Sequence, residues 1–140
     1  MSLAIKISLL FSGLFLLNGM LTGIWKYAKM MRSANHQAPV YVDIAHRTSF
    51  FYSFACLVIS RLIEFSPFSE TQQVLIVAAP ILYFALTVAG YMKEGFTNRT
   101  ENIFAERNFI TTWFMYDLIA AEVGGLILIL YGFAATQFFH

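Results

Sequence analysis

Charged residues are scarce in this chain, and their scarcity excludes most classes of soluble protein. Only 12% of its 140 residues are charged and 59% are hydrophobic, whereas an average soluble domain is about 25% charged. So little polar surface cannot cover a water-soluble globule. The net charge of +1 also lacks the basic excess typical of nucleic-acid binding. We therefore expect an integral membrane protein that contacts membrane lipid and has no nucleic-acid partner.

Cysteine is nearly absent as well, which excludes several kinds of site. The single cysteine, Cys56, cannot form an intramolecular disulfide and cannot build a cysteine-rich metal or iron–sulfur centre. It lies within a hydrophobic run, where a small buried residue is the simplest interpretation. Proline is rare too, and only Pro80 interrupts an apolar run, which helices in lipid tolerate.

What the chain does contain is long apolar stretches. A bilayer-spanning helix needs about 20 apolar residues, so the chain accommodates four spans and little else. The sequence predicts an all-α fold, a single domain that is a bundle of four transmembrane helices. The predicted helices cover about residues 4–25, 42–65, 73–92 and 108–137. The first apolar run is too long for a signal peptide and continues into Trp25 and Lys26 without a cleavage motif, so we expect a retained helix.

Lysine and arginine concentrate in the first and third connections between these helices. In a four-span bundle these two connections lie on the same side, and the positive-inside rule places that side in the cytoplasm. We therefore expect both termini on the non-cytoplasmic side, in a bacterial inner membrane. The residues concerned are Lys26, Lys29, Arg32 and Arg47 in the first connection, and Lys93, Arg99 and Arg107 in the third.

A narrow polar stripe follows the second predicted helix at steps of three and four residues, so that its members share one face. Small residues of this kind let two helices approach closely, and helix packing explains the serines as well as a functional site does. Asp43 and Arg47 are expected to pair at the start of this helix. The stripe consists of His46, Ser49, Ser53, Cys56, Ser60 and Glu64.

His46 is the strongest candidate for a functional residue in this stripe. An ionisable group within a bilayer is costly, so it needs a partner or a role. An imidazole here can carry a proton, form an interfacial hydrogen bond or bind a metal, and it is a common haem ligand. No second histidine lies in a predicted helix, because His36 is in a connection and His140 is the last residue. A lone histidine would leave one face of a haem iron open.

The other intramembrane polar residues are harder to interpret from the sequence. Glu122 in the fourth helix is expected to meet a partner such as Arg61 or Arg47, or to be protonated. Tyr83 and Tyr91 share one side of the third helix. Their phenols can hold a substrate oxygen or donate a proton, although Tyr91 equally suits an interfacial aromatic belt.

The layout resembles the small four-helix membrane proteins of the styrene oxide isomerase and hydroxylaminobenzene mutase type. The likeness covers roughly residues 10–92, and helix four matches only in length and hydrophobicity. It rests on the run Asn18-Gly19-Met20-Leu21-Thr22-Gly23 and on Ala45-His46 in the second helix.

The resemblance implies a haem-b-binding trimer with His46 as the axial ligand. It also implies that ferric iron acts as a Lewis acid on a lipophilic epoxide, which isomerises to an aldehyde. The family's substrate-contacting tyrosine falls on Tyr91. Tyr52 stands where the family has an asparagine, and Tyr83 where it has an aspartate. Tyr52, Tyr83 and Tyr91 are therefore the candidate catalytic residues.

Two other functions stay open at this point. A chain that is nearly all membrane span suits a non-catalytic accessory subunit of a larger respiratory or photosynthetic complex, with its small-residue faces as docking surfaces. A small transporter or proton-conducting protein would depend on Glu122, Arg61 and Glu64. The chain has no internal repeat or pair of broken helices that would favour a transporter.

Overall fold

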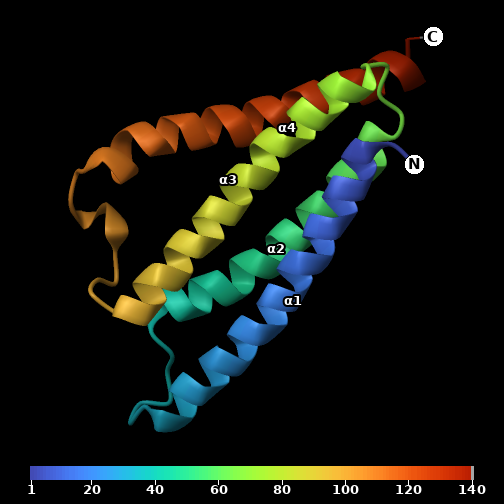
Figure 1. Cartoon of the computed structure of the whole chain (residues 1–140). Helices are drawn as coiled ribbons and strands as arrows, with labels where there is room; N and C mark the ends of the chain where they lie inside the picture. Colours follow the sequence, from blue (N-terminus) through green and yellow to red (C-terminus); the bar gives the residue numbers. More distant parts are fainter. Residues whose placement is uncertain (140) are drawn as a thin grey trace.

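The computed structural model describes residues 1–139 and contains four long helices joined by short connections (Figure 1). This confirms the predicted all-α fold class. A single 3-10 turn, η1, and a short π-helix, η2, lie between the third and fourth long helices. The bounds are Leu3–Arg32 for α1, Val40–Ile63 for α2, Glu70–Thr97 for α3, Ile103–Ala105 for η1, Ile110–Phe114 for η2 and Met115–Gln137 for α4.

Local sequence signals account for the helix ends. Ser2 precedes α1, and its hydroxyl accepts a hydrogen bond from the backbone N–H of Ile5 at 3.4 Å. A capping box begins α3, in which Ser69 and Gln72 each accept the other's backbone N–H. The same helix ends where Asn98 adopts the left-handed conformation, with φ 47°.

Two helices continue beyond their predicted spans. α1 runs past Trp25 to Arg32, and α3 runs from Glu70 to Thr97 rather than from 73 to 92. The predicted spans follow apolar runs alone. Polar residues at the ends of a run, such as Lys26 and Glu70, are good helix formers and let the helix continue.

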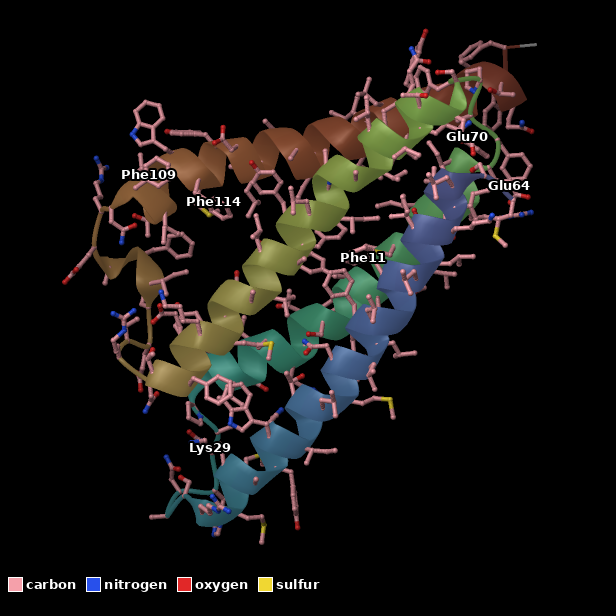
Figure 2. All side chains as sticks on the ribbon, in the orientation of Figure 1. Phe11, Lys29, Glu64, Glu70, Phe109 and Phe114 are labelled. Atoms are coloured by element: carbon pink, nitrogen blue, oxygen red, sulfur yellow. The ribbon has the colours of Figure 1, made fainter. Side chains whose placement is uncertain are left out.

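The helices pack as neighbours in chain order. α1 and α2 lie side by side over most of their length, α3 packs on α2, and α4 packs on α3 and part of α2 (Figure 1). The termini and the connection 64–69 lie at one end, and the connections 33–39 and 98–109 lie at the other. Figure 2 shows Glu64 and Glu70 at the first end and Lys29 at the second. The two basic connections therefore share one end, as the sequence predicted.

The apolar core lies where α1, α2, α3 and α4 meet. Glycines let α4 lie close to α3 and to the connection 64–69. A Cβ added to Gly125 would lie 3.0 Å from Cδ of Pro80, and one on Gly132 would lie 2.9 Å from Oγ of Ser66. The fully or nearly fully buried aliphatic side chains of this core include Ile59, Ile63, Val77, Ile81, Val88 and Ile129.

Three helical segments are long and apolar enough to cross a membrane, namely α1, α3 and Ile110–Gln137. In their most apolar 18-residue windows only 22%, 28% and 17% of the residues are buried inside the protein. Outward-facing apolar surface on this scale is typical of a protein surrounded by lipid. α2 does not reach the same apolarity, since it contains Asp43, Arg47 and Arg61 together with the serines of its stripe.

Candidate functional site

The polar stripe of α2 faces α1, where it forms a hydrogen-bonded seam. The hydroxyl of Ser12 donates to the backbone oxygen of Ser53, and the hydroxyl of Ser53 donates to the backbone oxygen of Ser12, both at 2.8 Å. Next to this reciprocal pair, Nδ2 of Asn18 donates to Oγ of Ser49 at 2.9 Å. These serines therefore serve helix packing. We call the residues Ser12, Asn18, Gly19, Gly23, His46, Ser49 and Ser53 the α1–α2 seam.

Removing one hydrogen bond of the reciprocal pair is expected to weaken the seam measurably. Ser53→Ala should lower the free energy of unfolding in detergent by about 0.6–1 kcal/mol, the size of an interhelical hydrogen bond in a membrane protein. Ser60→Ala is the matched control, because the Ser60 hydroxyl bonds within its own helix, to the oxygen of Leu57 at 2.6 Å. An equal loss in both variants would contradict a role of Ser53 between helices.

His46 lies in the same seam, with its imidazole against α1. Nδ1 of His46 is 2.8 Å from the backbone oxygen of Gly19, so Nδ1–H donates to that oxygen. The ring sits over Gly23, where an added Cβ would come within 2.9 Å of its Cε1. Phe50 packs against the imidazole edge-on, with ring centroids 5.1 Å apart. Gly23 thus makes room on α1 for the His46 ring, and Gly19, one turn earlier, makes room for the Phe50 ring.

This hydrogen bond decides what His46 can do chemically. With the proton on Nδ1, Nε2 carries the free lone pair, and a backbone carbonyl on Nδ1 is the usual way of orienting a metal-binding imidazole. Among residues 1–139 no hydrogen bond reaches Nε2. The same residues contain no group of three or more His, Cys, Asp and Glu that could hold a metal ion. Nε2 is therefore the ring nitrogen of His46 that has a lone pair available to accept a hydrogen bond or to bind a metal.

Charged residues join α1 and α2 near His46, towards the basic end of the bundle. The expected pair of Asp43 and Arg47 is confirmed, with Oδ2 and Nη2 2.5 Å apart. Nζ of Lys26, from α1, lies 2.6 Å from Oδ1 of the same carboxylate. Sequence reasoning missed this second partner, because it treated the α1 span as ending at Trp25. The carboxylate therefore binds both helices together beside the imidazole.

Of the three candidate tyrosines, Tyr52 lies on α2, and Tyr83 and Tyr91 lie on α3. Tyr52 stacks on Phe84, with centroids 4.0 Å apart and planes 13° apart. Tyr91 stacks on Tyr41 at 5.8 Å. The structure thus brings Tyr52 and Tyr91 to the same packed interface between α2 and α3.

Tyr83 and His46 are not part of that interface. Tyr83 lies against Phe114 of η2, with centroids 5.5 Å apart. His46 faces α1, and the step of six residues from it to Tyr52 places the two side chains about 120° apart around α2. That spacing was visible in the sequence and was the signal that the two do not share one pocket within a chain.

Glu122 has a partner that the sequence did not predict. Arg61 pairs with Glu64, and Arg47 pairs with Asp43. The phenol of Tyr52 donates instead to Oε1 of Glu122 at 3.5 Å. The expectation of an arginine partner for Glu122 is therefore wrong, because helical spacing does not show which neighbour a face of α4 meets. The alternative, a protonated Glu122, stays a prediction.

Comparisons with family models, curated proteins and solved structures found no match to this chain. The resemblance to the styrene oxide isomerase type thus stays a prediction from the Asn18–Gly23 run and Ala45-His46.

Proposed function

We propose that this chain is an integral membrane protein with four spans that binds haem b through Nε2 of His46. The observation that supports this proposal most directly is the 2.8 Å hydrogen bond from Nδ1 of His46 to the backbone oxygen of Gly19. It holds the ring in one orientation and leaves Nε2 as the ligand atom. Bound haem would supply an iron Lewis acid, held by Nε2 of His46.

The fourth span in this proposal is α2. Its 24 residues give a helix about 36 Å long, enough to cross the hydrocarbon core. It lies antiparallel between α1 and α3, and both of these are apolar enough to span. Ser49 and Ser53 of its polar stripe are buried against α1 and away from lipid. With the basic connections at one end, the positive-inside rule favours termini on the outer side of a bacterial inner membrane.

The proposal also includes a reaction, the isomerisation of a lipophilic, epoxide-like molecule. Tyr52 lies about 120° from His46 around α2, and the rings of Tyr83 and Tyr91 pack on Phe114 and Tyr41 of their own chain instead of on His46. A pocket with both a haem ligand and phenols therefore needs the tyrosines of a neighbouring copy, as in the trimer that the resemblance implies. In that pocket the phenols would hold the substrate oxygen or donate a proton to it.

An absorption spectrum of the detergent-purified protein, combined with its mass by light scattering, tests haem binding and oligomeric state together. The wild type is expected to show a Soret band and to run as a homo-oligomer. His46→Ala should lose the band, whereas His36→Ala, which changes an exposed histidine in the first connection, should keep it. A wild type without a Soret band, or an unchanged band in His46→Ala, would sink the proposal.

A second candidate function is that of an accessory subunit in a larger membrane complex. Gly13, Gly90 and Gly124 lie on three different helices, and a Cβ added to any of them would meet nothing within 4 Å. Small outward-facing residues of this kind let a neighbouring helix approach closely. Gentle detergent extraction decides between the two candidates: other polypeptides at fixed ratio support the subunit, and a pure homo-oligomer counts against it.

A further inference from the structure

Glu122 is the most isolated acidic side chain of the bundle interior. It lies near the middle of the helical segment Ile110–Gln137, one of the three that are long and apolar enough to span a membrane. Its side chain is half-buried, turned towards α2 and α3. A carboxylate at such a depth is costly unless a cation or several hydrogen bonds compensate for its charge.

The groups around Glu122 supply hydroxyls and no cation. From α2, the Tyr52 phenol donates at 3.5 Å, a long hydrogen bond. From α3, Tyr91 lies near the carboxyl, and Thr87 lies beside the Tyr52 phenol. The short η2 segment has no titratable residue. Within residues 1–139 no basic side chain pairs with Glu122.

The hydroxyl of Thr87 is a second sign that the polar groups around Glu122 lack hydrogen-bond partners. Its Oγ1 is buried and has no hydrogen-bond partner among residues 1–139. A single long bond to a carboxylate and an unpartnered hydroxyl, side by side in an apolar bundle, leave an ionised carboxyl poorly compensated. A carboxyl that carries a proton removes the uncompensated charge.

We propose that Glu122 is a proton-binding site inside the membrane, with the Tyr52 phenol as its hydrogen-bond donor and the Thr87 hydroxyl close by. The carboxyl carries its proton at neutral pH and releases it to the medium at alkaline pH. This site is separate from His46, which lies about 120° from Tyr52 around α2.

A hydrophobic carbodiimide tests the proposal, because it forms an adduct with protonated carboxyls that are reachable from lipid. The full chain in liposomes is treated over a series of pH values, and peptide mapping locates the adduct. We expect Glu122 to be modified at neutral pH, with a rate that falls about tenfold for each pH unit above its midpoint. Glu64 is the internal control, since it is exposed and paired with Arg61, and it should remain unmodified.

Infrared spectroscopy gives a second readout, the C=O stretch of a protonated carboxyl, which should be lost in Glu122→Gln. Absence of this band in the wild type, or labelling that does not change with pH, would overturn the proposal. Protection of Glu122 by sodium chloride at constant pH would also overturn it, in favour of a metal-cation site. If Glu122→Gln does not fold, the adduct on wild-type Glu122 and its pH dependence still test whether this carboxyl binds a proton.

Discussion

Gly95→Leu is expected to lower the free energy of unfolding by about 3 kcal/mol, the upper part of the range for overpacked interiors. Gly95 is buried near the end of α3, where it meets both α1 and α2. An added Cβ would lie 3.1 Å from the backbone nitrogen of Val42 and 2.9 Å from Cη2 of Trp25. A backbone atom cannot rotate away as a side chain does, so α3 and α2 would have to separate.

Gly90→Leu is the matched control for this substitution. It lies on the same helix, and an added Cβ would meet nothing within 4 Å. Replacing this glycine should therefore leave stability unchanged or raise it by up to about 1 kcal/mol, through helix propensity. Unfolding by denaturing detergent, followed by circular dichroism, measures both variants. Equal stability of the two variants would show that α2 and α3 do not approach as closely as the structure has them.

Gly23→Leu is expected to break the hydrogen bond between His46 and Gly19 and to weaken the proposed haem binding about tenfold. A Cβ at residue 23 would come within 2.9 Å of Cε1 and 3.2 Å of Nδ1 of His46. The imidazole must then leave the Gly19 oxygen, and Nε2 loses its orientation. A displacement that costs about 1.4 kcal/mol reduces haem affinity about tenfold, which a Soret titration of the purified protein would detect.

Gly13→Leu provides the comparison on the same helix. Its added side chain meets nothing within 4 Å, so haem content and stability should stay near those of the wild type. Full haem content in Gly23→Leu would contradict the assignment of His46 as the ligand. Loss of haem in both variants would point to a general weakening of α1 and not to the imidazole.

The arrangement of His46 and the tyrosines also bears on assembly. Within one chain, α2 presents His46 to α1 and Tyr52 to α3 and α4. A chemical step that needs both a haem ligand and a phenol would therefore take place between copies. An enzyme of this kind would lose activity when diluted to monomers, whereas haem-free proton binding at Glu122 would persist in a single chain.

The sequence by itself determined the helical class, the apolar segments and the content of each helix face. Charge scarcity and run length are properties of local sequence, and the pairing of Asp43 with Arg47 follows from spacing along one helix. The polar stripe of α2 could be recognised for the same reason, because side chains three and four residues apart share a face.

Only the tertiary structure decided which helix each face meets. Periodicity specifies angles around a helix axis, but not the rotation of one helix against another, which depends on how side chains and glycines interlock. The packing of Gly23 against His46 turned the stripe towards α1, and the approach of α4 placed Glu122 against Tyr52 in place of an arginine. The sequence could name these residues, but their partners depend on contacts between segments that are far apart along the chain.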